Sequence, residues 1–363
     1  MIYLDYAASA PPFPEVICRM SEVAGCAYGN PGAIHQAGAQ ARQILQESRK
    51  ILAAALNVRP EEVFFTSGAT EANNWALAIA TADPRKKHIV CGKTEHSSLL
   101  KPVKQLQQKG YEVTFLSPDR QGRIHPEDAE MALRQDTALL CVQAVNNETG
   151  VIQDVQALAA VARKHRVPYL CDAVQSFGHV QQPLHKADMI CLSAHKFGGP
   201  RGIGCLVIRQ NLPAKPLLLG GGQEFGLRSG TENLPAIAGF ALAVQLAQEQ
   251  PHHEVLSRML AQGFREICPE LEIAGEEAHR SSILCCRFPG ISAEKIVARL
   301  DQLGICASPG AACAAGSGKP SPVLLAMGYT ESQAREFVRF SPGRLTTPEQ
   351  IRAVVKAMEQ ILA

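Results

Sequence analysis

The sequence has 363 residues, of which 46% are hydrophobic and 19% are charged, and its formal net charge is +2 at pH 7. This length suits two domains better than one, and the apolar content supports a large core and excludes a mainly disordered chain. The nearly balanced charge gives no reason to expect nucleic acid or an anionic membrane as a partner. The opening residues, "MIYLDYAASAPP", do not resemble a signal peptide, and no run of about 18 uncharged apolar residues occurs, so we expect a cytoplasmic protein without a membrane span.

The 12 cysteines include no C-x-x-C pair, which argues against a zinc site and against a disulfide framework. Several lie inside apolar, strand-like runs such as "IVCG", "LLCVQ" and "MICLS", where a thiol serves as a small core residue. Cys313 is the exception, because it lies among small residues, glycines and prolines in "SPGAACAAGSGKPSP". Read alone, that stretch is typical of a linker.

A helix is predicted over residues 33–56, where apolar side chains recur on one helical face. After it, short apolar runs alternate with helical segments such as Val155–His165. The runs predict seven strands: Val63–Thr66, His88–Gly92, Val113–Leu116, Ala138–Ala144, Pro168–Ala173, Met189–Ser193 and Gly204–Arg209.

Most of these runs are almost continuously hydrophobic, which is typical of parallel strands buried on both faces. Crossovers through the intervening helices should be right-handed. The segment "HKFGGPRGIG" is too short to hold a crossover helix, so the last strand is predicted to run antiparallel. The fold class is therefore α/β, with a mostly parallel seven-stranded sheet.

Beyond about residue 245 the pattern changes to a smaller α+β arrangement, with strand-like runs in "SSILCCRFPG", "GICAS" and "FVRFSP". We divide the chain into residues 1–15, a segment packing with the small domain, residues 16–245, the large domain, and residues 246–363, the small domain. The last of these contains Cys313. No internal repeat is present.

Chemically useful side chains follow several predicted strands, at the carboxyl ends where ligands bind in sheets of this kind. Small residues around Ser67–Thr70 open a helix and expose N–H groups suited to a phosphate. Each signal alone has an ordinary structural explanation, such as a helix cap, a turn residue or a solvated lysine. The candidates are Ala69, Thr70, His96, Asn147, Asp172, Gln175, Ser193, His195 and Lys196.

Together these residues supply a phosphate cradle, an acid, an aromatic base and a lysine. Pyridoxal phosphate needs that set, because its aldehyde takes a lysine, its ring nitrogen a carboxylate and its phosphate several N–H and hydroxyl donors. The residues therefore predict a pyridoxal phosphate site.

In its motifs the sequence resembles the cysteine desulfurases, which are class V members of the fold-type I pyridoxal phosphate enzymes. The resemblance covers almost the whole chain, in the order of the family's motifs. It implies a large cofactor-binding domain followed by a smaller α+β domain. The matching pieces are "YLDYAASAP", "GNPGAIHQAG", "FTSGATEANN", "TEHSS", "NNETG", "CDAVQSFG", "SAHKFGGPRGIG", "RSGTEN", "SPGAAC" and "VRFSPGRLTT".

The resemblance implies a role for each cofactor-binding residue. Lys196 would form the Schiff base and then shuttle a proton, and Asp172 would pair with the pyridine nitrogen. Gln175 would hydrogen-bond the phenolic oxygen of the ring, and His96 would stack on the ring and handle protons. The phosphate would be held by Thr70, Ser193, His195 and the backbone around Ala69.

The same resemblance implies a substrate and partners. Arg339 would clamp the carboxylate of L-cysteine, for which the planar guanidinium is suited, and Asn147 would help orient substrate and ring. Cys313 would take the sulfur as a persulfide, leaving L-alanine, and pass it to an acceptor protein for iron–sulfur cluster assembly or for thiolation of a cofactor or tRNA. Thr231 would reach the phosphate in the neighbouring subunit's site, so the protein would be a homodimer.

Two departures from the family pattern are present: Ser9 and Ala10 replace a common threonine pair, and Ala311 replaces a serine. The sequence leaves the sulfur acceptor open. Selenocysteine lysis and transamination are alternative class V reactions, although transamination has no use for the Cys313 thiol. A non-catalytic sulfur carrier is a further alternative, but it would not need Lys196, Asp172 and His96 together.

Overall fold

The computed structural model describes residues 1–249, 254–278, 280–310 and 319–363. Within them a seven-stranded sheet has the strand order β2-β8-β7-β6-β5-β3-β4. All its strands run parallel except β8, which is antiparallel to both neighbours, as predicted. The strands are β2 (Val63–Thr66), β3 (His88–Gly92), β4 (Glu112–Leu116), β5 (Thr137–Cys141), β6 (Tyr169–Asp172), β7 (Met189–Ser193) and β8 (Gly204–Ile208).

Two predicted boundaries differ from the structure by three residues, and several others differ by one. The strand predicted to reach Ala144 ends at Cys141, and two residues later the N–H of Gln143 donates to the Glu95 carboxyl group instead of to a neighbouring strand. The helix predicted from residue 33 begins at Gln36, because the His35 side chain accepts the N–H of Gly38 as an N-cap. In both places a side chain accepts a backbone N–H group.

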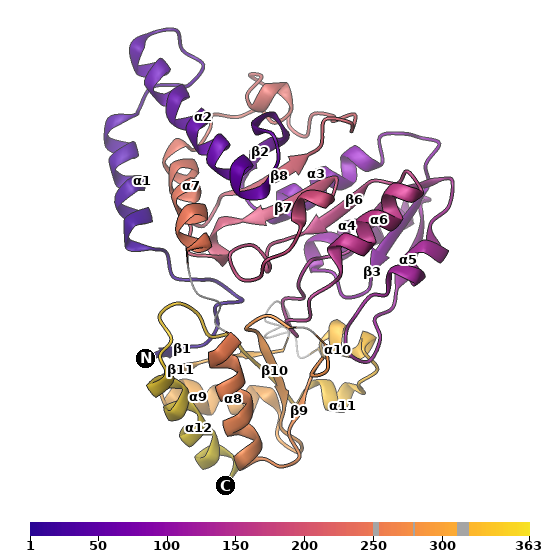
Figure 1. Ribbon diagram of the computed structural model, residues 1–363, viewed down its shortest axis with the longest axis vertical. Coiled ribbons are helices and arrows are strands. Elements are labelled where there is room, and N and C mark those ends of the chain that lie inside the picture. The colour runs from indigo at the N-terminus through magenta and orange to yellow at the C-terminus, as the bar shows by residue number, and fades with distance from the viewer. Residues whose placement is uncertain (250–253, 279, 311–318) are drawn as a thin grey trace.

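Helices cover both faces of the large sheet (Figure 1). Alternate residues of each strand point to opposite faces, so the side chains of each strand divide between two separate apolar clusters. One face packs against α1 (Pro14–Cys26), α2 (Gln36–Leu56), α5 (Pro126–Ala132), α6 (Val155–Lys164) and α7 (Leu234–Gln248). The other face packs against α3 (Ala69–Ala80) and α4 (Ser97–Gln108).

A second, four-stranded sheet has the order β12-β13-β10-β9 and its own apolar core. Its strands are β9 (Glu272–Ile273), β10 (Leu284–Arg287), β12 (Ser308–Pro309) and β13 (Phe337–Phe340). Its helices are α8 (Glu254–Ile267), α9 (Ala293–Gln302), α10 (Pro322–Ala326), α11 (Glu331–Ala334) and α12 (Pro348–Leu362). Figure 1 shows this part below the large sheet, with both chain termini on it.

The N-terminal segment joins the two parts. Its strand β1 (Ile2–Tyr3) pairs in parallel with β11 (Ile305–Cys306), and Leu4 is buried in the core of the smaller part. A few residues on, the N–H of Ala10 donates to the carbonyl of His195 in the larger part. Short 3-10 helices complete the described elements: η1 (Pro60–Glu62), η2 (Leu184–Lys186), η3 (Ala194–Lys196) and η4 (Glu224–Gly226).

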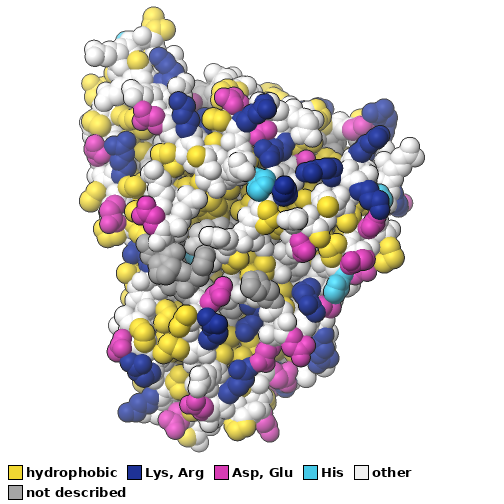
Figure 2. Space-filling model, viewed as in Figure 1, with side chains coloured by type: hydrophobic (Ala, Val, Ile, Leu, Met, Phe, Trp, Pro, Cys, Tyr) yellow, Lys and Arg dark blue, Asp and Glu magenta, His cyan; other side chains and the backbone are white. Residues whose placement is uncertain are grey.

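The surface carries both signs of charge. On the face shown in Figure 2, acidic and basic side chains are interspersed, as the small net charge leads one to expect. In the described part of the chain, none of the helices has both the length and the apolar character needed to cross a membrane.

Gly204 provides a test of how the sheet supports the loop before α3. A Cβ atom at this position would lie 2.4 Å from the carbonyl oxygen of Leu192 and 2.8 Å from the Cα of Gly68. Both are backbone atoms, so Gly204→Ala must displace β7 or the start of α3. We expect the free energy of unfolding to fall by about 1–3 kcal/mol in denaturant titrations.

Gly25→Ala is the matched control, because Gly25 is exposed in α1 and a Cβ there meets no atom within 4 Å. This change should leave stability equal or raise it by up to about 1 kcal/mol, since alanine favours helix. Equal stability of the two variants would contradict the close approach at Gly204.

Candidate active site

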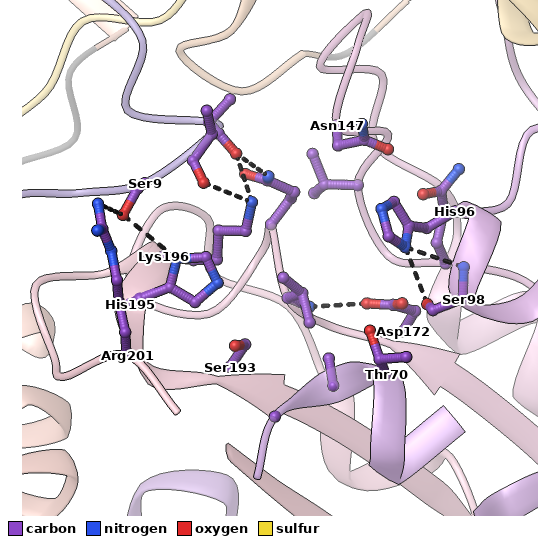
Figure 3. Close-up of a pocket in the computed structure, with 18 of the residues that line it drawn as sticks. Ser9, Thr70, His96, Ser98, Asn147, Asp172, Ser193, His195, Lys196 and Arg201 are labelled. Carbon is purple, nitrogen blue, oxygen red and sulfur yellow. Dashed lines mark hydrogen bonds between the residues drawn. The ribbon is translucent and has the colours of Figure 1, made fainter. Parts of the chain in front are cut away.

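A cavity of about 620 Å³ lies at the carboxyl ends of the central strands, where the sequence predicted a site. It brings together residues from both halves of the structure. Ten predicted site residues line it: Ala69, Thr70, His96, Asn147, Asp172, Gln175, Ser193, His195, Lys196 and Arg339. Figure 3 shows Lys196 and His195 facing His96 and Asp172 across it.

Two further predicted residues are not among those that line this cavity. Thr231 lines a smaller cavity of about 210 Å³, which shares Ser67 and Gly202 with the main one. Cys313 lies outside the described residues, so its position relative to the cavity stays a prediction.

Lys196 ends the short helix η3 directly after β7, which delivers its side chain to the cavity. Its Nζ atom donates to two backbone carbonyls of the N-terminal segment, those of Ala7 at 2.7 Å and Ala8 at 3.0 Å. The Gln175 side chain donates to the same Ala7 carbonyl at 2.7 Å. The ammonium group is therefore held by neutral acceptors rather than by a carboxylate in these contacts.

Asp172 is the last residue of β6 and is buried. Its carboxylate accepts the backbone N–H of Val174 at 3.1 Å and the side-chain amide of Asn73 at 3.0 Å. Both donors are neutral, so these bonds fix the carboxylate without neutralising it. A buried carboxylate arranged in this way is suited to a cationic ring N–H.

The same network continues to His96. The Asn73 amide also donates to the Ser98 hydroxyl at 2.9 Å, and that hydroxyl lies 2.9 Å from the Nδ1 atom of His96. His96 Nδ1 further accepts the backbone N–H of Ser98 as the N-cap of α4. Because Nδ1 acts as an acceptor, the neutral ring carries its proton on Nε2.

The opposite end of the cavity suits a phosphate. The N-terminus of α3 begins at Ala69, after Gly68, and such a terminus attracts anions. Thr70, Ser193 and Arg201 also line the cavity. Burial, and secondly the charges of Lys196 and Arg201, lower the pKa of His195 to about 4, so its ring is neutral near pH 7 and keeps one N–H to donate.

Arg339 belongs to β13 of the smaller sheet and is only 1% exposed. One terminal nitrogen donates to the Asp5 carboxylate at 2.7 Å, and the other donates to the Asn147 carbonyl at 2.8 Å. Its Nε atom is buried and has no partner among the described residues. The positively charged guanidinium group of Arg339 thus lines the cavity and has N–H donors that are not used in these two bonds.

Several supporting residues were not predicted from the sequence. Asn73 and Ser98 are ordinary helix residues in the pattern, and nothing distinguishes Asn73 from its neighbour Asn74. Glu95 and Glu148 were not among the predicted site residues either, yet both are buried. Their only signal was their position beside His96 and Asn147.

Both buried carboxyl groups have raised pKa values. Burial, with a smaller contribution from Asp172, raises the pKa of Glu95 to about 8, although the N–H of Gln143 donates to it at 2.8 Å. Burial raises the pKa of Glu148 to about 7, against the opposing effects of Ser321, Arg339 and His96. Near pH 7 Glu95 is therefore largely neutral, and the neighbouring Asp172 does not face a second full negative charge.

The donor set fits pyridoxal phosphate. Asp172 offers a carboxylate with neutral donors to the ring nitrogen, α3 offers N–H groups to the phosphate, and Lys196 lines the same cavity. Among the described residues there is no group of three or more His, Cys, Asp or Glu side chains that could hold a metal ion.

A family model described as aminotransferase class-V matches residues 2–354. The chain therefore belongs to the class-V aminotransferase family, and the family and fold predicted from the sequence are confirmed.

Individual relatives and solved structures match this chain over almost its whole length. The chain is 36% identical to the cysteine desulfurase IscS of Dictyoglomus turgidum, over 99% of this chain and 94% of that relative. Among solved structures it is similar to a NifS-like protein, with a TM-score of 0.92 and 33% identity over 99% of both chains. It is also similar to SspA in complex with cysteine, with a TM-score of 0.84 and 32% identity over 94% of this chain and 98% of that one.

The raised pKa of Glu95 predicts a pH dependence of stability. Between its ordinary value of 4.5 and about 8, the folded protein holds a proton that the unfolded chain has released. The free energy of unfolding should therefore fall as pH rises through this window, by about 1.4 kcal/mol for each unit of difference between the two pKa values. Glu95→Gln cannot lose that proton, so its stability should fall less steeply between pH 5 and pH 8 in denaturant titrations.

Glu359→Gln is the control, because Glu359 is exposed on α12. This variant should follow the wild-type profile. Parallel profiles for Glu95→Gln and the wild type would show that Glu95 is ionised in the folded protein at neutral pH.

Proposed function

We propose that this protein is a pyridoxal phosphate-dependent cysteine desulfurase, which removes sulfur from L-cysteine and releases L-alanine. The observation that carries the proposal is the convergence of Lys196, Asp172, His96 and Arg339 on one cavity. The full-length similarity to proteins named as cysteine desulfurases supports the same reaction.

The cofactor would be held at three points. Lys196 would form the Schiff base with its aldehyde, Asp172 would hold the proton of the ring nitrogen, and Gln175 would donate to the phenolic oxygen. The phosphate would lie at the start of α3, where its ligands would be Thr70, Ser193, His195 and the backbone of Ala69. When bound, the cofactor supplies an electron sink for the bonds broken at the substrate.

The protein's own groups would then act on L-cysteine. Arg339 would bind the substrate carboxylate through two parallel N–H donors, and Asn147 would orient the substrate. Lys196 would accept and return a proton at Nζ after substrate replaces it. His96 would face the ring and exchange a proton through Nε2, because the contacts of Nδ1 with Ser98 place the proton of the neutral ring on Nε2.

Cys313 would be the nucleophile. A thiolate at this position would attack the substrate sulfur, so that the carbon–sulfur bond breaks, a sulfur–sulfur bond forms and the substrate carbon takes a proton. One thiol and one L-cysteine thus yield one persulfide and one L-alanine. The persulfide would pass to a sulfur-acceptor protein that serves iron–sulfur cluster assembly or thiolation of a cofactor or tRNA.

The reaction is tested by incubating the protein, loaded with pyridoxal phosphate, with L-cysteine and dithiothreitol, which reduces the persulfide and releases its outer sulfur as sulfide, and by measuring alanine and sulfide. The wild type should produce both, and Cys313→Ser should lose most of the turnover while keeping the cofactor's yellow colour, because the hydroxyl cannot accept sulfur in the same way. Lys196→Ala should lose both colour and turnover.

An inactive, yellow wild-type protein would contradict the desulfurase proposal. Equal turnover of Cys313→Ser and the wild type would contradict only the proposed role of Cys313 as the nucleophile.

We also propose a homodimer in which Thr231 reaches the phosphate in the partner's site. The loop bearing Thr231 is tied to α3 through Arg228, which pairs with Glu71 at 2.8 Å. Light scattering of the holoprotein should give the mass of two chains, and Thr231→Ala should weaken cofactor binding. A monomer that retains the cofactor would be incompatible with a site shared between subunits.

A further inference from the structure

Arg339 is oriented by acceptors that come from two distant segments. Its guanidinium group lies between the Asp5 carboxylate of the N-terminal segment and the Asn147 carbonyl of the larger part. A guanidinium group has five N–H donors, and these two bonds leave three of them, including the buried Nε–H. A substrate carboxylate needs two, so Arg339 can keep both contacts while it binds substrate.

Asp5 is itself firmly placed. It forms a backbone bridge to Ser341, two residues after Arg339, and its carbonyl accepts the N–H groups of Ala8 and Ser9. The Tyr3 hydroxyl also lies 3.1 Å from that carbonyl. The side chain of Asp5 is 21% exposed, whereas that of Arg339 is 1% exposed. The Asp5 carboxylate is thus held in place, and its hydrogen bond restricts the long, flexible side chain of Arg339.

The same N-terminal segment also contacts Lys196 from the larger part of the structure. Two and three residues after Asp5, the Ala7 and Ala8 carbonyls accept Lys196, and Ala7 also accepts Gln175. Asp5 therefore sets the position of Arg339 relative to the backbone that contacts the lysine.

We propose that Asp5 is a positioning residue that holds the Arg339 guanidinium in the orientation that binds the substrate carboxylate. This inference rests on the proposed function, since it takes an amino acid carboxylate as the ligand of Arg339. Asp5 does not touch the substrate and acts only through Arg339. Its loss should weaken binding of carboxylate-bearing ligands and leave the chemical step intact once substrate is bound.

Two variants separate orientation from charge. Asp5→Asn keeps an oxygen that can accept the Arg339 hydrogen bond but removes the negative charge, whereas Asp5→Ala removes both. If the role is orientation, Asp5→Ala should raise the KM for L-cysteine about 10-fold or more, with kcat changed less than about twofold. Asp5→Asn should stay within about threefold of the wild-type KM. If Asp5 merely competed with substrate for Arg339, both variants would lower KM.

A binding measurement provides a readout apart from turnover. The spectral change of the bound cofactor is titrated with L-cysteine and with cysteamine, which lacks the carboxylate. The apparent Kd for L-cysteine should rise in Asp5→Ala, and the Kd for cysteamine should equal that of the wild type. Asp83→Ala, which breaks an exposed ion pair with Arg85 at 2.9 Å, is the control and should change neither.

The outcomes distinguish the inference from its alternatives. An unchanged Kd for L-cysteine in Asp5→Ala, or an equal loss for both ligands, would overturn the positioning role. A purely structural role would lower the thermal stability of the cofactor-free Asp5→Ala and Asp5→Asn alike, without selectivity between ligands. A wild-type protein that shows no spectral response to L-cysteine would contradict the proposed function instead.

Discussion

The site depends on the backbone of the N-terminal segment, which lies between the two sheets and contacts both. Its Ala7 and Ala8 carbonyls accept Lys196 from the large sheet, while its Asp5 carboxylate accepts Arg339 from the small one. In the proposed function, the lysine that binds the cofactor and the arginine that binds the substrate carboxylate must be spaced to match one small substrate. Here the spacing is set by the turn of Asp5 to Ala8, which is closed by hydrogen bonds from the N–H groups of Ala8 and Ser9 to the Asp5 carbonyl, rather than by direct contact between the two side chains.

The large sheet supplies the rest of the arrangement through its topology. Parallel strands place their carboxyl ends at one edge, so Asp172 at the end of β6 and Lys196 just after β7 open onto the same cavity. The hydrogen-bonded series Asp172, Asn73, Ser98 and His96 then links the acid to the aromatic base through α3 and α4. Because the donors to the Asp172 carboxylate are neutral, the network fixes the orientation of this carboxylate while it leaves the negative charge for the ligand.

The sequence predicted the strands and most cavity residues because these depend on local patterns: continuous apolar runs and polar residues just after them. Asn73, Glu95 and Asp5 were not predicted, because their roles arise from contacts between segments far apart in sequence, such as the 334 residues that separate Asp5 from Arg339. Glu95 illustrates the difficulty, since nothing in "TEHSS" distinguishes a buried neutral carboxyl group from a solvated turn residue. The strand end at Cys141 was missed for the same reason, as the Glu95 carboxyl group accepts the N–H of Gln143.

The central claim is that the cavity binds pyridoxal phosphate through Lys196. Borohydride reduction of the holoprotein fixes the cofactor to whichever amine carries it, and peptide mass mapping then identifies that residue. The account predicts a single cofactor adduct on the peptide that contains Lys196, abolished by Lys196→Ala. An adduct on a different lysine, or none in a protein that still binds the cofactor, would contradict it.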